Sequence, residues 1–219
     1  MGGLRIIRPA NGEFPVIKNV IFDVGNVFVQ WSPREIVERC FDLRKGSDEN
    51  LQRAEALFQS PLWKSLNRGE LTQQEAERAY QIQFGLSAEQ TRTLFFHIMD
   101  HLELIDGTEE IAHRLRKAGY RVFALTDNVS EIVAYLKKRH RFWTAFEGAV
   151  ISAEIGLLKP DPGIFRHAME KFNLLAAETV FFDDVSANVD GASSIGMKAR
   201  LFTTPSRCVE DLQALGLSF

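Results

Sequence analysis

The chain has 219 residues, of which 45% are hydrophobic and 25% are charged, and its formal net charge at pH 7 is −3. This length supports one sizeable core and at most a small accessory domain. The slightly acidic balance gives no reason to expect nucleic acid or an anionic membrane as a partner, and no apolar run approaches the roughly 20 residues of a membrane span.

The two cysteines indicate a reducing compartment. Cys40 and Cys208 have neither the spacing of metal ligands nor the density of a secreted disulfide scaffold. Residues 1–15 lack the apolar centre of a signal peptide and are expected to form a loosely held tail. We therefore expect a cytoplasmic protein, either a monomer or a homodimer.

The first predicted element is a short buried strand. Its apolar run, residues 20–22, ends at Asp23 and then turns through Gly25 and Asn26. A carboxylate at the end of a buried strand is costly to desolvate unless a cation meets it. The strand end is therefore a candidate binding site for a cation.

A helical pattern follows over residues 34–101. Ser32 and Pro33 indicate its start, and Thr72–Glu75 and Ser87–Gln90 are capping boxes that indicate further helix starts. Apolar residues recur at helical spacing, as in Leu51, Ala54, Leu57 and Phe58. We expect an all-helical cap over 34–101, inserted into a core domain made of 16–33 and 102–219.

The second half of the chain alternates between strands and helices. Strands are expected at 120–127, 148–152, 179–182 and 199–202, and helices between and after them, the last at 209–215. Such alternation predicts a parallel sheet with helices on both faces. The expected fold is therefore α/β, a Rossmann-like doubly wound parallel sheet with an inserted all-helical cap.

Polar residues stand where these strands end. Asp23, Thr126 and the pair Asp183 and Asp184 follow apolar runs directly, and Lys159 follows the strand at 148–152 through a short loop. In such sheets ligands bind at the carboxyl ends of the strands. Carboxylates from two strand ends would make a concentrated anionic site, for which a hard divalent cation is the simplest partner.

Four segments, in this order, resemble the signature segments of the haloacid dehalogenase-like hydrolases: Phe22–Val27, Leu125–Thr126, Lys159–Pro160 and Phe182–Asp184. The resemblance covers about residues 18–203, and the helical block corresponds to the inserted cap of that family. The first segment most resembles a branch of phosphatases that act on small sugar phosphates. The resemblance implies a Mg²⁺-dependent phosphatase of a small phosphorylated metabolite.

The resemblance also implies catalytic and metal-binding roles. Asp23 would be the nucleophile, forming an aspartyl-phosphate that water hydrolyses. Lys159 would place a cation between Asp23 and the phosphate. Mg²⁺ would be held by Asp23, the backbone carbonyl of Gly25 and Asp184.

Further residues are implied to contact the substrate or to support these groups. Thr126, Asp127 and Lys159 would bind the substrate, and Asp183 would orient Lys159 or a metal-bound water. The family more often has Asn at the position of Asp127. A carboxylate beside the phosphate is unfavourable unless it points away or binds a sugar hydroxyl.

Gly25 departs from the pattern of most phosphatases in the family, which have a second Asp there as general acid. General acid help is typically worth about 10²- to 10⁴-fold. Its absence favours a leaving oxygen that needs little protonation. The hemiacetal oxygen of an anomeric sugar phosphate, such as glucose 1-phosphate, meets that requirement.

Two other functions remain open. In a 2-haloacid dehalogenase the same Asp attacks carbon without a metal, but the pair Asp183 and Asp184 would then repel the carboxylate of the substrate, which favours the phosphatase. The other is a catalytically weak, phosphate-binding regulatory protein. This alternative remains because Gly25 stands where most phosphatases of the family have the general acid.

Two groups in the cap carry weaker signals. His97 and His101 have the spacing of a zinc-binding helix pair, but no Glu follows His97 and no third ligand is apparent, so a solvated helix face is expected. Some residues in or next to the cap could close over a substrate, although the aromatic ones are expected to pack into the helices: Trp31, Arg34, Trp63, Arg68 and Glu70.

Overall fold

The core of the fold is a five-stranded parallel sheet. The computed structural model describes residues 16–41 and 47–219, so the expected tail at 1–15 lies outside the described residues. The strands are β1 (Asn19–Phe22), β2 (Arg121–Thr126), β3 (Gly148–Ile151), β4 (Thr179–Asp183) and β5 (Lys198–Leu201). Their order is β3-β2-β1-β4-β5, and every neighbouring pair is parallel. The order reverses beside β1, where a ligand crevice is expected in such sheets.

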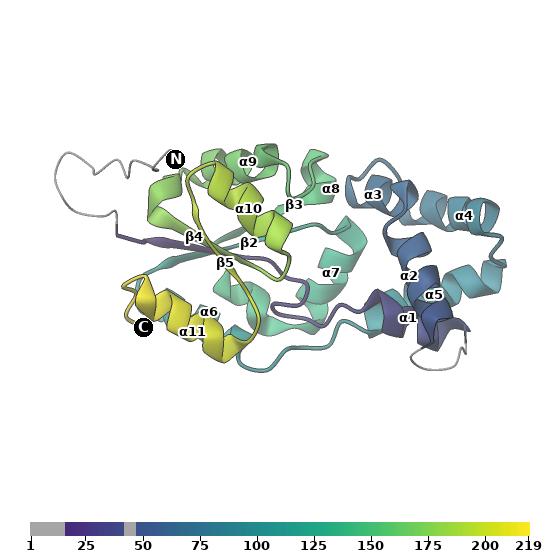
Figure 1. Cartoon of the computed structure of the whole chain (residues 1–219), viewed down its shortest axis with the longest axis horizontal. Coiled ribbons are helices and arrows are strands. Elements are labelled where there is room, and N and C mark those ends of the chain that lie inside the picture. Colours follow the sequence, from purple (N-terminus) through teal and green to yellow (C-terminus); the bar gives the residue numbers. More distant parts are fainter. Residues whose placement is uncertain (1–15, 42–46) are drawn as a thin grey trace, which may run out of the picture.

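Helices cover both faces of the sheet (Figure 1). Val20 and Phe22 face α6 (Thr108–Lys117), α7 (Ser130–Arg139) and α11 (Pro205–Ala214). Ile21 faces α9 (Pro162–Phe172) and α10 (Ser186–Ser194). Val20, Ile21 and Phe22 are all fully buried, because successive residues of a strand point to opposite faces and helices cover both faces of this sheet. The prediction of a doubly wound α/β fold is confirmed.

Five helices lie together beyond the carboxyl ends of the strands (Figure 1). They are α1 (Pro33–Phe41), α2 (Asp48–Phe58), α3 (Pro61–Asn67), α4 (Gln73–Phe84) and α5 (Ala88–Asp100). Both predicted capping boxes, at α4 and α5, are formed. The Ser32 hydroxyl accepts a hydrogen bond from the Glu35 backbone N–H at 3.3 Å, as expected for the start of α1. The domain boundaries at 33/34 and 101/102 stay predictions.

Some local expectations were wrong. Leu51 is 46% exposed, and Asn50 takes the buried position beside it, donating to Glu38 Oε1 at 3.0 Å. A one-turn helix, α8 (Ser152–Ile155), follows β3 where only a loop was expected. Helix α11 begins at Pro205 rather than at residue 209, because the Thr204 hydroxyl caps its first turn. Short 3₁₀ helices span Arg141–Ala145 and Ala176–Glu178. No described helix has the length and apolar character needed to cross a membrane.

Candidate active site

Three strand ends bring polar side chains to one edge of the sheet. Asp23 follows β1 directly, and its backbone N–H donates to the Phe182 carbonyl of β4 at 2.9 Å. Asp183 is the last residue of β4 and Thr126 the last of β2. All three are buried. Parallel pairing of β1 with both neighbours places these residues together, as the sequence indicated.

Lys159 lies among these carboxylates. Its Nζ is 2.8 Å from Asp23 Oδ1 and 2.6 Å from Asp183 Oδ2, and its side chain is almost fully buried. Burial alone would lower the pKa of Lys159, but the charges of Asp23, Asp183 and Asp127 outweigh it and raise the pKa. Lys159 therefore stays protonated.

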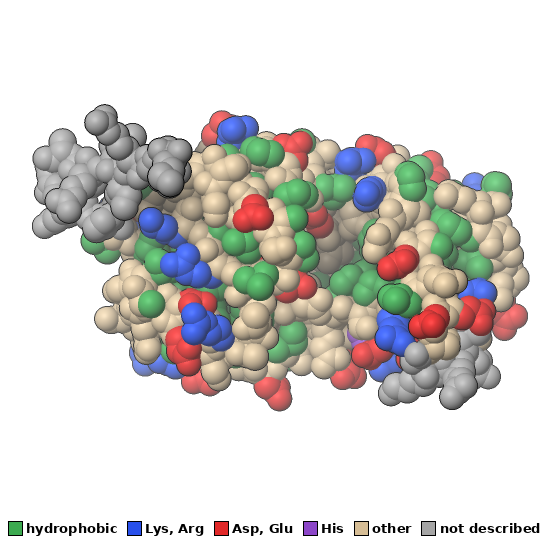
Figure 2. All heavy atoms as spheres, in the orientation of Figure 1, with side chains coloured by type: hydrophobic (Ala, Val, Ile, Leu, Met, Phe, Trp, Pro, Cys, Tyr) green, Lys and Arg blue, Asp and Glu red, His purple; other side chains and the backbone are tan. Residues whose placement is uncertain are grey.

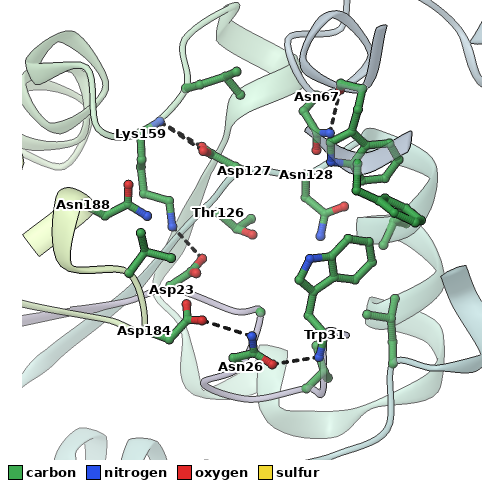
Figure 3. Close-up of a pocket in the computed structure, with 18 of the residues that line it drawn as sticks. Asp23, Asn26, Trp31, Asn67, Thr126, Asp127, Asn128, Lys159, Asp184 and Asn188 are labelled. Carbon is green, nitrogen blue, oxygen red and sulfur yellow. Dashed lines mark hydrogen bonds and ion pairs between the residues drawn. The ribbon is translucent and has the colours of Figure 1, made fainter. Parts of the chain in front are cut away.

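Asp127 fixes the backbone of Lys159. Both of its carboxylate oxygens accept from the Lys159 backbone N–H, at 3.1 Å each (Figure 3). Burial raises the pKa of Asp127, although the nearby Lys159 opposes the rise. Asp127 also lines the cavity, so its predicted contact with the substrate stays a prediction beside this structural contact.

Asp183 and Asp184 differ in what holds them. The Oδ1 atom of Asp183 accepts from the Val185 backbone N–H at 2.8 Å and from Asn188 Nδ2 at 2.9 Å, and its Oδ2 accepts from Lys159. Both oxygens of Asp183 are therefore occupied. Asp184 Oδ2 accepts from Asn26 Nδ2 at 3.0 Å, which leaves Oδ1 without a side-chain partner in the described part of the chain. Asp184 is thus the better placed to bind an ion.

The site has the donor set of a hard divalent cation. Asp23, Asp183 and Asp184 each offer an oxygen, all within 4.8 Å of one another, and no other such group occurs in residues 16–41 and 47–219. No hydrogen bond between described residues ends on the backbone carbonyl of Gly25, which also lines the cavity. Oxygen donors of this kind suit Mg²⁺. The residues present therefore fit the predicted ion.

The electrostatics of the site also favour a bound cation. Burial raises the pKa of Asp23 to about 8; Lys159 opposes the rise, and the charges of Asp183 and Asp184 add to it. Burial likewise raises the pKa of Asp184. One ammonium group therefore faces several carboxylates, so a further positive charge would stabilise their ionised forms.

Asn26 joins the metal-binding side of the site to the cap, a role that the sequence did not reveal. It has a left-handed backbone conformation with φ of 51°, which Asn tolerates better than most residues. Its Nδ2 donates to Asp184, and its Oδ1 accepts from the Trp31 backbone N–H at 2.8 Å (Figure 3). The sequence signal that could have indicated this role is the position of Asn26 in the turn that follows Asp23.

A cavity of about 310 Å³ lies between the strand ends and the cap, in the hollow seen at the centre of Figure 2. Asp23, Thr126, Lys159 and Asp184 line its sheet side. Of the suggested closing residues, Trp31 and Trp63 line it, whereas Arg34, Arg68 and Glu70 do not. The sequence did not reveal that the following residues reach the cavity: Phe58, Lys64, Asn67, Asn128 and Asn188.

The histidine pair lies apart from this site. The expectation of a solvated face was wrong for His101, which is buried, with Nδ1 3.9 Å from Glu35 Oε2. Burial lowers the pKa of His101, partly offset by Glu35. Neither His97 nor His101 belongs to the metal-binding group described above.

Comparison with known proteins places this arrangement in a family. The model of the haloacid dehalogenase-like hydrolases matches residues 17–196. The chain belongs to the haloacid dehalogenase-like hydrolase family. The resemblance drawn from the four sequence segments is thereby confirmed, while the roles predicted for Asp23, Thr126, Lys159, Asp183 and Asp184 stay predictions.

Individual relatives of this haloacid dehalogenase-like chain carry more specific names. A sesquiterpene phosphatase of Aspergillus oryzae is 26% identical over 200 residues, 91% of this chain and 97% of the relative. A D-ribitol-5-phosphate phosphatase of Bacteroides thetaiotaomicron is 22% identical over 191 residues, 84% of this chain and 90% of the relative. A crystal structure of a haloacid dehalogenase family enzyme from Bacteroides thetaiotaomicron, in complex with magnesium and inorganic phosphate, has a TM-score of 0.72 at 21% identity and covers 86% of this chain and 95% of that chain.

Proposed function

We propose that this chain is a Mg²⁺-dependent phosphatase that hydrolyses a small phosphorylated metabolite through an aspartyl-phosphate on Asp23. The observation that carries the proposal is the position of Asp23. It lies at the reversal point of the sheet, with Lys159 Nζ 2.8 Å away and the carboxylates of Asp183 and Asp184 beside it. The relatives named as phosphatases support the same reaction class.

The reaction divides into two steps. A carboxylate oxygen of Asp23 attacks phosphorus, the bond from phosphorus to the leaving oxygen breaks, and an aspartyl-phosphate results. Water then hydrolyses this intermediate, releasing inorganic phosphate and restoring Asp23. Lys159 opposes the rise in the pKa of Asp23, which favours the ionised nucleophile, and offers positive charge to the phosphoryl oxygens, while Thr126 donates a hydrogen bond from its hydroxyl.

Asp23, the Gly25 carbonyl and Asp184 would hold Mg²⁺, while Asp183 holds Lys159 in place. When bound, the ion neutralises the repulsion between the phosphate and the carboxylate that attacks it. A bound magnesium and phosphate pair in the similar crystal structure from Bacteroides thetaiotaomicron supports this choice of ion.

Gly25 offers no side-chain acid for the leaving group. The structure has space there, because a Cβ at position 25 would meet only Trp31 Cβ, at 3.8 Å. The site therefore suits a substrate whose leaving oxygen departs without receiving a proton from residue 25. Among sugar phosphates, the anomeric ones satisfy this requirement. The preference for sugar phosphates stays a prediction, as does a reducing cytosol for the protein.

Phosphate release from p-nitrophenyl phosphate with and without Mg²⁺ tests the proposal, because its leaving group needs no protonation. We expect turnover that EDTA abolishes and that Asp23→Asn lowers by about 10³-fold or more. Metal-independent release of chloride from 2-chloropropionate would instead indicate the dehalogenase. Phosphate binding without turnover would indicate the regulatory protein.

A further inference from the structure

We propose that the leaving group of the substrate is an apolar hydrocarbon alcohol, such as a terpenoid, which lies against an aromatic panel formed by Trp31, Phe58 and Trp63. The inference rests on the proposed function, since it concerns the other end of the same phosphate ester. It narrows the substrate class to phosphate esters whose alcohol has few or no further hydroxyl groups, and it therefore replaces the sugar phosphates predicted from the sequence.

The aromatic panel is a packed unit at the cap side of the cavity. The rings of Trp31 and Trp63 are stacked, with centroids 5.7 Å apart and planes 10° apart. Phe58 meets Trp31 edge-on at 5.6 Å and Trp63 at 5.1 Å. Such contacts stabilise one another beyond the burial of their area. The panel therefore presents a preformed surface rather than a set of mobile side chains.

The panel is connected to the phosphate end of the cavity. Asn26 binds the Trp31 backbone through Oδ1 and Asp184 through Nδ2. Figure 3 shows the Trp31 ring on the opposite side of the cavity from Asp23 and Lys159. A phosphate ester with its phosphorus at Asp23 would therefore direct its alcohol portion toward the panel.

The cap side offers apolar area and few polar partners. Trp31 and Trp63 are only half-buried, and further apolar side chains extend the lining: Leu102, Ile132 and Leu158. Asn67 Nδ2 already donates to the Trp63 carbonyl at 2.8 Å. Lys64 is the cationic side chain from the cap among the described residues that line the cavity.

This lining discriminates between two kinds of alcohol. Sugar hydroxyls that leave water must find new hydrogen bonds, and the panel offers only the indole N–H groups of Trp31 and Trp63, whereas a hydrocarbon gains by leaving water. The relative from Aspergillus oryzae that aligns with 91% of this chain is named a sesquiterpene phosphatase, which agrees with the apolar choice.

Geranyl phosphate and glucose 6-phosphate form the decisive pair of substrates. Both are esters of primary alcohols, so they differ in apolar character rather than in the type of leaving oxygen. We expect kcat/KM for geranyl phosphate to exceed that for glucose 6-phosphate by about tenfold or more. A preference for glucose 6-phosphate or glucose 1-phosphate would overturn the inference.

Acetyl phosphate separates this inference from the proposed function, because its acetate leaving group is small and needs no proton. Without Mg²⁺-dependent release from acetyl phosphate, the proposed phosphatase itself fails. Release from acetyl phosphate together with a preference for the sugar esters contradicts only the apolar leaving group.

Variants of the panel test the assigned surface. Trp63→Ala should lower kcat/KM for geranyl phosphate by roughly tenfold more than for acetyl phosphate, and Trp63→Phe should restore most of the loss. Phe96→Ala is the matched control, since Phe96 is a 59% exposed aromatic of the same cap that does not line the cavity. It should change neither value. Equal losses on both substrates in Trp63→Ala would overturn the inference.

Binding provides a readout that does not depend on turnover. In the Asp23→Asn variant, tryptophan fluorescence should report a Kd for geranyl phosphate about tenfold lower than for glucose 6-phosphate. Equal affinities for the two esters would contradict the proposal.

Discussion

Lys159 sets the charge balance around Asp23. It is the ammonium group that meets Asp23 and Asp183, at 2.8 and 2.6 Å. A buried carboxylate that loses its cationic partner is strongly destabilised. Asp127 holds the backbone of Lys159, which explains how a carboxylate can replace the Asn that the family more often has there: it accepts an N–H rather than facing the phosphate with free charge.

Magnesium affinity should depend on pH because of Asp23. Burial raises the pKa of Asp23 to about 8 in the metal-free protein. The ion binds the carboxylate form, so protons compete with it below that pKa and cease to compete above it. Calorimetric titration should therefore show affinity that increases with pH up to about 8 and then levels off. Constant affinity from about pH 6 to 9 would contradict this reading of the site.

Gly25→Asp should broaden the range of leaving groups. An added Cβ meets only Trp31 Cβ, at 3.8 Å, and Gly25 does not have a positive φ, so the backbone accepts a side chain. The new carboxyl can act as the general acid, an effect typically worth about 10²- to 10⁴-fold. We expect kcat for glucose 6-phosphate to rise at least about tenfold, with little change for p-nitrophenyl phosphate. A parallel change for both substrates would argue against the role assigned to position 25.

At the scale of elements, α3 connects the cap to the core. The Ser152 hydroxyl at the start of α8 donates to the Asn67 carbonyl at 2.7 Å and accepts from the Asn128 backbone N–H at 2.9 Å. Gly69, just beyond α3, lies against the Ala153 carbonyl. Through these contacts the position of α3 determines how its residues Trp63 and Asn67 line the cavity.

Gly69→Ala should displace the cap. Gly69 has φ of +70°, and a Cβ there would overlap the Ala153 carbonyl oxygen. Gly85→Ala is the matched control, because Gly85 has φ of +64° but nothing lies within 4 Å of its added Cβ. Both variants carry the backbone strain of about 1–2 kcal/mol. Urea unfolding should show a larger loss for Gly69→Ala, and only this variant should lower kcat/KM. Equal effects would mean that the contact with Ala153 does not position the cap.

At the scale of the whole molecule, the sheet and its polar edge could be predicted because they depend on local patterns. Apolar runs that end on Asp23 and Asp183 mark strand ends, and parallel pairing then brings those ends together. The loop contacts could not be predicted from the sequence, because the roles of Asn26 and Asp127 depend on hydrogen bonds to residues far along the chain.

The cavity lining could not be predicted for a related reason. Helical periodicity identifies Phe58 as apolar and inward-facing, but it does not tell whether that face meets another helix or a ligand. The docking of the cap on the core depends on contacts between distant segments, such as Ser152 with Asn67. His101 illustrates the same limit, since the sequence offered it no third metal ligand and a solvated helix face was expected, while tertiary packing buries it.

The most direct test of the account is to trap the phosphorylated protein. After rapid acid quenching of a reaction with p-nitrophenyl phosphate and Mg²⁺, peptide mass spectrometry should find one phosphoryl group on the peptide that contains Asp23. The label should be absent when EDTA removes the ion and absent in Asp23→Asn. A phosphoryl group on any other residue, or labelling of Asp23 that persists without Mg²⁺, would contradict the account.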